Sequence, residues 1–369
     1  MSKPRIRELG IPLEGTPGIF NAITDVMGVK VGHTTLISGE GTLEEGKGPV
    51  RTGVTAILTC DESMDPLFGA WDALNGCGEI TGTTWLEESG LLHGPLMITN
   101  TFSVNMVKDA VSKWMHQRNY HTLGLSVVTE TYDGFLNDAF GFHVKEEHAW
   151  AALDNAASGT VPEGNVGGGT GMICHQFKGG IGTASRVLDA EHGGFTVGVL
   201  VQANHGTRQN LRIAGVPVGA EITDLLPGKY PEVESMKNSS IIAILATDCP
   251  LLPHQLKRLC KRIPLGIARV GGNGDNWSGD IFVAFSTAPI GEADPIGICP
   301  VGMYPNEKMD ALFAAVIQAT EESILNALVA AETMIGINNH TAYAIPTDRV
   351  LDIMRKYNRL SDFQIITSY

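Results

Sequence analysis

Three segments of this chain resemble strands with apolar side chains on both faces, and this feature limits the possible folds more than any other. They are FTVGVLVQ (195–202), SIIAILAT (240–247) and DIFVAFST (280–287). Successive side chains of a strand point to opposite faces of its sheet, so a strand without polar alternation is buried on both sides. The sequence therefore predicts sheets that lie inside the protein, between other layers.

Similar short segments, rich in β-branched residues and bounded by Gly, Asn or Asp, occur at 53–60, 96–103 and 123–131. The covering layers are predicted to be helices. Apolar residues recur at spacings of three and four from 309 to 329, which is the pattern of a helix with a buried face.

Residues 104–117 and 254–262 also have helical patterns. Several strands are joined by Gly-rich turns that are too short for a crossover, which favours a mixed or antiparallel sheet system covered by helices. No Ser-, Pro- or charge-rich linker interrupts the chain, so we expect a single domain over residues 1–369.

The net charge restricts the possible partners. The chain has 26 Lys and Arg against 40 Asp and Glu, a formal charge of −14, and we find no dense basic run. We therefore expect neither nucleic acid nor an anionic membrane surface as a partner.

The N-terminal segment MSKPRIRELGIPLEGTPGIF lacks the apolar region of a signal peptide, so we expect a soluble, cytoplasmic protein.

The cysteines and histidines do not predict a metal site. No CxxC pair occurs, and His143 and His148 are five apart, a spacing that does not put both on one helical face. We expect no metal, a solvated polar segment at 143–148, and free buried thiols. The six cysteines are Cys60, Cys77, Cys174, Cys249, Cys260 and Cys299.

Several common catalytic and nucleotide-binding motifs are missing. The chain contains no GxSxG, HExxH or GxxxxGK[ST] sequence, which disfavours an α/β-hydrolase, a zinc protease and a P-loop enzyme. The Gly-rich segments at 164–172 and 178–185 are therefore predicted to form tight turns and close backbone contacts instead of a phosphate site.

Two adjacent serines, Ser239 and Ser240, stand where a polar segment that ends at Asn238 meets the buried strand SIIAILAT, which begins at Ser240. A serine hydroxyl is a weak nucleophile at neutral pH and needs a base beside it. If the peptide bond before the serine were cut, the freed α-amine, with a reference pKa of about 7.7 to 8.0, could serve as that base. Such a serine needs no catalytic histidine.

Other polar residues at strand ends could complete this chemistry. The side-chain amide of Asn204 could donate to an oxyanion, and Ser278 and Asp280, two apart and thus on one side of a strand, could hold an ammonium group. Turn formation is the alternative for each of them, because Asn caps turns and Ser-Gly-Asp is a good turn sequence.

Several blocks together resemble the β-aminopeptidases and the L-aminopeptidase/D-Ala-esterase/amidase family. These are self-cleaving N-terminal nucleophile hydrolases related to the nylon-oligomer hydrolases. The blocks cover essentially the whole chain: ITDVMGVKVGHTTL, TGVTAIL, SVVTETYDGFLND, GNVGGGTGM, VGVLVQANHG, KNSSIIAILATDCPLLPHQLKRL and GGNGDNWSGDIFVAFSTA. The resemblance implies an α+β fold, a four-layer αββα sandwich of the ornithine-acetyltransferase-like group. It also implies a precursor that cuts itself into chains 1–239 and 240–369, which stay associated.

The resemblance also assigns roles to residues. In the family, a Ser lies 38 positions after the nucleophile and an acidic residue lies 40 positions after it. Counting from Ser240 reaches Ser278 and Asp280, whereas counting from Ser239 does not. The family usually has Gly or Asn before the cut and this chain has Ser239, so a cut between Asn238 and Ser239 remains the alternative.

Glu130 and Tyr132 match positions that face the substrate pocket in the family, where a carboxylate would hold the free ammonium of a substrate. A strand end that runs into an Asp-Gly turn is the other interpretation of this segment. The expected reaction is the release of N-terminal β-, L-α- or D-residues from short peptides, amides and esters, without a metal or organic cofactor. An acyltransferase like the ornithine acetyltransferases and a non-catalytic binding protein are the alternatives, and relatives suggest a homotetramer.

Overall fold

The computed structural model describes residues 3–59, 64–120, 125–228 and 239–360. Cys60 and Asn238 lie outside the described residues. The five other cysteines are all free thiols, and Cys174, Cys249 and Cys260 are buried, as expected from their spacing. Cys77 and Cys299 are exposed, so the expectation of burial was wrong for these two.

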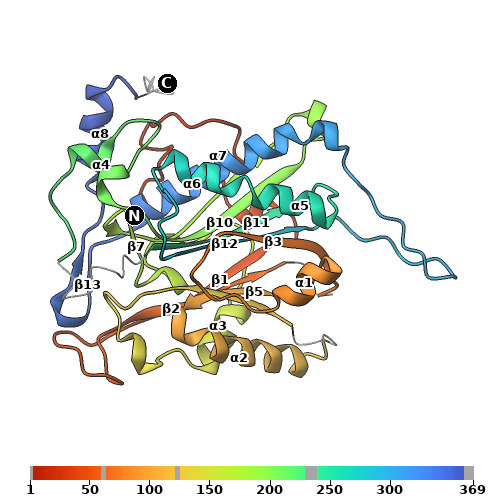
Figure 1. The fold of residues 1–369 in the computed structure, drawn as a ribbon, viewed down its shortest axis with the longest axis horizontal. Helices are drawn as coiled ribbons and strands as arrows, with labels where there is room; N and C mark the ends of the chain where they lie inside the picture. Colours follow the sequence, from red (N-terminus) through yellow and green to blue (C-terminus); the bar gives the residue numbers. More distant parts are fainter. Residues whose placement is uncertain (1–2, 60–63, 121–124, 229–238, 361–369) are drawn as a thin grey trace, which may run out of the picture.

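Most strands belong to two mixed sheets (Figure 1). The smaller sheet has the order β1-β2-β5-β6 and the larger one the order β4-β3-β12-β11-β10-β9. The pairs β5–β6 and β11–β12 are parallel, and the other neighbours are antiparallel. The prediction of a mixed sheet system is thus confirmed. The bounds are β1 Lys30–Ser38, β2 Val50–Leu58, β3 Leu67–Gly76, β4 Leu91–Leu92, β5 Leu96–Asn100, β6 Val127–Thr131, β9 Gly180–Val187, β10 Thr196–Asn204, β11 Ser239–Thr247 and β12 Ser278–Ser286.

The two sheets face each other across an apolar core. Ile57 and Ile98 of the four-stranded sheet pack in one cluster with Leu200, Ile242 and Ile244 of the six-stranded sheet. The alternate residues of β11 belong to a different cluster on the outer face. Strand β11 is therefore buried on both faces, as its sequence predicts.

Helices cover the outer face of each sheet (Figure 1). Helices α5 (Pro253–Cys260), α6 (Ile263–Arg269) and α7 (Asp310–Ala330) share an apolar cluster with the six-stranded sheet. Helices α2 (Val104–Gln117) and α3 (Glu146–Asp154) share another with the four-stranded sheet. The other elements are α1 Thr83–Ser89, α4 Val218–Glu221, α8 Thr347–Lys356, β7 Ile173–Cys174, β8 Phe177–Lys178, β13 Met334–Ile335 and β14 Thr341–Ala342.

Helix α7 is the one helix in the described part of the chain that is long and apolar enough to cross a membrane. However, 83% of its apolar window is buried inside the fold, where the helix packs against β9 and β10. Its composition is therefore explained by its place as the central covering helix.

Two predicted segments have different bounds in the structure. The strand predicted at 96–103 ends at Asn100, because Thr101–Ser103 forms a 3-10 turn that leads into α2. The strand predicted at 123–131 begins only at Val127 within the described residues. Strands β1, β3 and β9 were not predicted. The outer half of β3 carries Asp72 and Asn75 and is partly exposed. The prediction of tight turns at 178–185 was wrong, because Gly180–Val187 forms the buried strand β9.

The Gly-rich segment at 164–172 packs closely against the sheets, as predicted. Gly167 has a φ of +53°, which favours glycine. A Cβ on Gly168 would lie 2.2 Å from Oε1 of Gln202.

The segment at 143–148 is less solvated than expected, because His143 is partly buried and pairs with Asp138 at 2.8 Å.

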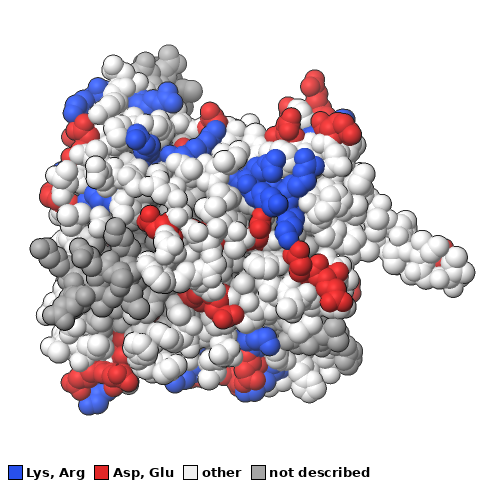
Figure 2. Space-filling model, viewed as in Figure 1, with Lys and Arg blue, Asp and Glu red and all other residues white. Residues whose placement is uncertain are grey.

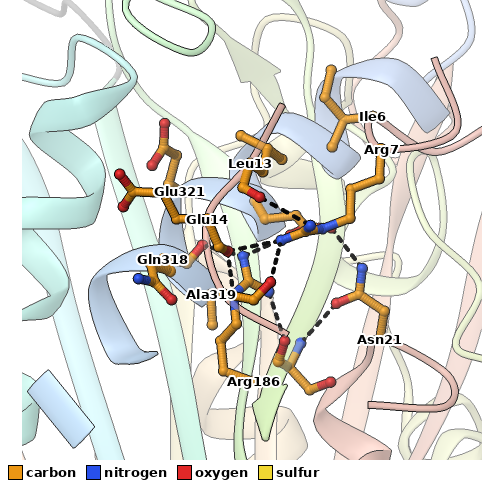
Figure 3. A network of polar contacts seen from close by, with 12 residues as sticks. Ile6, Arg7, Leu13, Glu14, Asn21, Arg186, Gln318, Ala319 and Glu321 are labelled. Atoms are coloured by element: carbon orange, nitrogen blue, oxygen red, sulfur yellow. Dashed lines mark hydrogen bonds and ion pairs between the residues drawn. The ribbon is translucent and has the colours of Figure 1, made fainter. Parts of the chain in front are cut away.

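The N-terminal segment is tied to α7 by a buried charge network. Figure 3 shows Arg7, Asn21 and Arg186 pointing toward one another. All three contact the carboxylate of Glu322: Arg7 and Arg186 at 2.7 Å each, and Asn21 Nδ2 at 2.6 Å. The side chains of Arg186 and Glu322 are 2% and 1% exposed, so each charge depends on the other for its compensation.

The surface carries one basic patch on the face drawn in Figure 2. It lies over the α5–α6 region, where the sequence has Lys257, Arg258, Lys261 and Arg262. Lys257 pairs with Glu87 at 2.7 Å, so part of this charge is compensated within the molecule.

Candidate active site

The residues predicted to catalyse the reaction lie at one end of the six-stranded sheet. Asn204, the last residue of β10, pairs with Ser240, the second residue of β11. Ser240 pairs in turn with Gly279 of β12, and Gly279 pairs with Gly76 at the end of β3. These four residues form one row across four neighbouring strands, so regular sheet structure fixes the positions of Asn204 and Ser240.

Ser240 lies on the face of the sheet that is turned toward the four-stranded sheet. Side chains alternate along a strand, and Ile242, two residues further on, belongs to the core between the sheets. The hydroxyl oxygen of Ser240 accepts a hydrogen bond from the backbone N–H of Gly279 at 3.1 Å. While the bond to Ser239 is intact, the nitrogen of Ser240 is an amide and cannot act as a base. The intact chain thus holds the hydroxyl of Ser240 in a defined position.

Ser278 and Asp280 form a hydrogen-bonded pair at the start of β12. Ser278 Oγ donates to Asp280 Oδ1 at 2.6 Å, and Asn75 Nδ2 donates to Asp280 Oδ2 at 3.0 Å. Burial raises the pKa of Asp280, while the bonds from Ser278, Asn75 and the backbone N–H of Ile241 oppose this rise. Because Ile241 directly follows Ser240, the carboxylate lies beside the first residues of β11.

Asn204 has a defined amide orientation. Its Oδ1 accepts from the backbone N–H of Ile173 at 2.8 Å, and its Nδ2 donates to the carbonyl of Tyr132 at 3.0 Å. The NH₂ group is therefore directed toward the four-stranded sheet, on the face that Ser240 shares. An amide NH₂ group has two protons, so it can also donate to an oxyanion that forms beside the serine.

Glu130, in β6, reaches the same end of the molecule from the opposite sheet. Its carboxylate accepts hydrogen bonds from the Glu79 N–H at 2.9 Å and from the Thr101 hydroxyl. Burial raises the pKa of Glu130, these bonds lower it, and the charge of Glu79 raises it. A Cβ on Gly78 would lie 3.3 Å from Glu130 Oε1 and also 3.3 Å from Gly279 Cα. Only a glycine therefore separates this carboxylate from the start of β12.

Tyr132 follows β6 and forms part of an aromatic surface. Its ring meets Phe102 edge-on, with centroids 6.3 Å apart. Phe102 also contacts Phe140 and Phe142, which are 55% and 54% exposed. An apolar wall that is open to solvent thus lies next to the Glu130 carboxylate.

The structure brings all the predicted site residues to this region. Asn204, Ser240, Ser278 and Asp280 lie on three adjacent strands, Glu130 and Tyr132 come from the opposite sheet, and Ser239 begins β11 opposite Ser278. Sequence reasoning missed Asn75, Glu79 and Thr101. The Asn-Gly pair at 75–76 predicts only a turn, and the contact of Asn75 with Asp280 spans 205 positions.

Comparison with known proteins identifies the family of this chain. The model of "Peptidase family S58" matches residues 21–342. A β-peptidyl aminopeptidase from Sphingosinicella microcystinivorans is 53% identical over 97% of this chain and 93% of its own length. The solved β-aminopeptidase of a Burkholderia species has 45% identity and a TM-score of 0.87, and covers 96% of this chain and 99% of its own.

The solved L-aminopeptidase D-Ala-esterase/amidase of Ochrobactrum anthropi has 46% identity and a TM-score of 0.88, with 97% of this chain and 100% of its own covered. It is described as a prototype of the serine aminopeptidases with a variant of the N-terminal nucleophile hydrolase fold. The family resemblance found in the sequence is thus confirmed, and neither an acyltransferase nor a binding protein is favoured. The chain belongs to peptidase family S58, and it is an aminopeptidase.

Proposed function

We propose that Ser240 is an N-terminal nucleophile that releases the first residue of short peptides, amides and esters. The row formed by Asn204, Ser240 and Gly279 carries this proposal. It places a hydroxyl between an amide donor on one side and a backbone N–H on the other, on rigid strands. Such preorganised donors are the main requirement of acyl transfer through a tetrahedral intermediate.

In each turnover, the free α-amine of Ser240 takes the proton of the hydroxyl as Oγ attacks the substrate carbonyl. Asn204 Nδ2 and a backbone N–H stabilise the oxyanion. The C–N bond then breaks, the ammonium passes its proton to the leaving nitrogen, and an ester to Ser240 remains. Water, deprotonated by the same amine, hydrolyses this ester. Ser278 and Asp280 orient the amine and stabilise its charged form.

The amine would arise by self-cleavage of the precursor. Ser240 Oγ attacks the carbonyl carbon of Ser239, the peptide bond is converted to an ester, and water hydrolyses that ester. Chains 1–239 and 240–369 result and stay associated, since β11 is held between β10 and β12. We assign the product to the four-layer αββα class of the ornithine-acetyltransferase-like group.

The strand register favours Ser240 over Ser239 as the nucleophile. Asn204 pairs directly with Ser240, and consecutive residues of a strand alternate between the two faces of the sheet. The nucleophile has to share a face with its oxyanion donor. Ser240 meets this condition.

Glu130 would select substrates with a free amine. Its buried carboxylate lies beside the aromatic surface around Tyr132, so an ammonium group could pair with Glu130 while a side chain contacts the rings. The 53% identical relative is named as a β-peptidyl aminopeptidase, which makes short β-peptides the first substrates to test. Amides and esters come next, from the name of the Ochrobactrum protein.

We further propose a homotetramer in the cytoplasm. The cytoplasmic location rests on the sequence alone. Support for association comes from the segment between β12 and α7, which projects from the body of the molecule (Figure 1). It exposes Ile296, Ile298, Val301 and Met303 by 46 to 81%, and apolar side chains on a projecting segment suit contacts with other copies of the chain.

The decisive experiment combines the denatured mass of the purified protein with N-terminal sequencing of its fragments. The wild-type chain should give a fragment that begins Ser-Ile-Ile-Ala. Ser240→Ala should remain a folded, intact and inactive precursor. Ser239→Ala is the matched control, and should still be cut before Ser240 and retain activity.

Three results would contradict the proposal. They are full activity of Ser240→Ala, a wild-type chain that stays intact, and a wild-type fragment that begins Ser-Ser-Ile-Ile. The last result would move the nucleophile to Ser239. Circular dichroism of each variant separates a loss of folding from a loss of chemistry.

A further inference from the structure

A second group of reactive side chains lies next to the active site and takes no part in the proposed mechanism. Cys174, at the end of β7, lies beside His175 and His205, and one ligand atom from each is within 4.8 Å of the others. All three side chains are buried, with exposures of 0%, 0% and 3%. This is the only such cluster of His, Cys, Asp and Glu among the residues that the structure describes.

The hydrogen bonds of His175 fix its tautomer. Its Nδ1 lies 3.1 Å from the carbonyl oxygen of Thr207, and a carbonyl can only accept, so Nδ1 carries the proton. The other nitrogen, Nε2, therefore has a lone pair directed into the interior. A backbone carbonyl on the second nitrogen is the usual support of a metal-binding histidine.

The lone pair of His175 Nε2 is buried and has no hydrogen-bond partner within the described parts of the chain. Nε2 of His205 has no partner there either, while Nδ1 of that ring is the atom that lies beside Cys174. A buried polar atom without a partner costs about 1–3 kcal/mol, and such an atom commonly marks an ion or a water that belongs to the structure.

The thiol of Cys174 completes a set of soft donors. Its Sγ lies 3.9 Å from Nδ1 of His205, a separation that an ion about 2.3 Å from sulfur and 2.0 Å from nitrogen can bridge. Thiolate and imidazole together suit Cu(I) and Zn²⁺ far better than Mg²⁺ or Ca²⁺. The thiolate is the form that binds a metal, so the ion must displace the thiol proton.

The charges around the cluster select between these two ions. The charged groups beside the cluster are cations. Lys178, in the strand β8 that pairs with β7, donates through Nζ to three backbone carbonyls, as an ammonium group does, and Arg208 donates to the carbonyl of His175 at 3.1 Å. A divalent ion with one thiolate and two neutral imidazoles leaves a net charge of +1, and burying an uncompensated charge is costly. A monovalent ion with the same ligands leaves no net charge.

We propose that Cys174, His175 and His205 bind one Cu(I) ion. Binding forms a Cu–S bond and two Cu–N bonds and releases the thiol proton of Cys174 to solvent, with no change of oxidation state. The chemistry proposed for Ser240 does not use the ion.

The position of the ion gives it a structural role. The backbone N–H of His175 donates to the carbonyl of His205 at 2.6 Å, and that of Ile173 holds the side chain of Asn204 at 2.8 Å. The ion would therefore connect the two segments that orient the amide of the oxyanion donor.

The test is an anaerobic titration of the purified enzyme with Cu(I) in competition with bicinchoninate. We expect one Cu(I) per wild-type chain that the competitor does not remove. X-ray absorption should show one sulfur and two nitrogen neighbours. Cys174→Ala should bind at least about 100-fold more weakly, since the loss of a mere supporting residue already costs 10- to 100-fold. Cys260→Ala removes another buried thiol, and this matched control should bind like wild type.

A second readout covers the case in which Cys174→Ala folds poorly. Cu(I) should raise the unfolding temperature of the wild type and of Cys260→Ala, in proportion to its binding. Failure of the wild type to keep Cu(I) against the competitor would overturn the proposal and leave a buried water as the occupant. Equal binding by Cys174→Ala, or stoichiometric Zn²⁺ that excess Cu(I) cannot displace, would also overturn it.

Discussion

Replacing Glu130 by Gln should separate substrate recognition from chemistry. The two side chains have nearly the same shape, and Gln can keep both contacts: its oxygen accepts from the Glu79 N–H, and its NH₂ group donates to the Thr101 hydroxyl, which can turn to accept. The change therefore removes a charge without opening a cavity. Self-cleavage involves no free amine, since the nitrogen of Ser240 is still an amide at that stage, so it should proceed as in the wild type.

The magnitude follows from the contact that is lost. A hydrogen bond to a charged group contributes about 1.5–3 kcal/mol, against about 0.5–1.5 kcal/mol for a neutral one. The difference of about 1–2 kcal/mol corresponds to a loss of about 5- to 30-fold in kcat/KM for substrates with a free ammonium. Acetylated substrates carry no such charge and should lose nothing further.

The pH dependence gives an independent check. Burial raises the pKa of Glu130, so its charged form is lost as pH falls through that raised value. The acid limb of kcat/KM, which reports the free enzyme, should therefore lie above the ordinary range of a glutamate. Glu79→Gln removes a charge that raises this pKa and should move the Glu130 limb to lower pH. Glu130→Gln should remove the Glu130 limb and leave the limb of the Ser240 amine, the base of the proposed mechanism.

The assay compares kcat/KM for an amino-acid anilide and its N-acetylated form across the pH range, in the wild type and in both variants. Equal loss of self-cleavage and of turnover in Glu130→Gln would refute the reasoning, because it would make Glu130 a structural residue. An acid profile of Glu130→Gln that is identical to that of the wild type would refute it as well.

Three further predictions concern other parts of the molecule. Asn204→Ala should lower kcat by about 100- to 1000-fold. A loss below tenfold would contradict the role of Asn204 as an oxyanion donor. Asp280→Asn should lower the pKa of the Ser240 amine by about 1 to 3 units. The acid limb of the pH profile of kcat should then move to lower pH. An unchanged limb would contradict a contact between Asp280 and this amine. Glu322→Gln leaves the charge of Arg186 buried without its partner, and should cost about 3–5 kcal/mol in urea unfolding of the uncleaved precursor. Asp224→Asn, which breaks an exposed ion pair, is its control and should show no comparable loss.

The strands around Ser240 could be predicted because they carry apolar side chains on both faces. The predicted segments 195–202, 240–247 and 280–287 differ from β10, β11 and β12 by no more than two residues at either end. A strand buried on both faces leaves few alternatives for such a run. Strand β3 was missed because it has an exposed half, where propensity is a weak guide.

Residues of the candidate site could be predicted only where the functional group of the residue itself suggests a role. Ser240, Asn204 and Asp280 stand next to buried strands, and their family resemblance supplied the roles. Asn75 and Thr101 act through pairings between segments far apart in the sequence, so no local pattern marks them. The group of Cys174, His175 and His205 was missed for the same reason, since 30 positions separate its two parts.

Sheet register also explains why one centre could perform both self-cleavage and turnover. In the parallel pair of β11 and β12, Ser239 lies opposite Ser278 and Ser240 opposite Gly279. The bond to be cut thus begins inside the ladder, next to the donor that holds the Ser240 hydroxyl. Cutting it frees the amine at the strand end while Ser240 keeps its neighbours on both sides. A substrate carbonyl that later takes the place of the Ser239 carbonyl would meet the same hydroxyl and the same amide of Asn204. The maturation step therefore requires no geometry beyond that of catalysis, and variants of Asn204 should slow both reactions together.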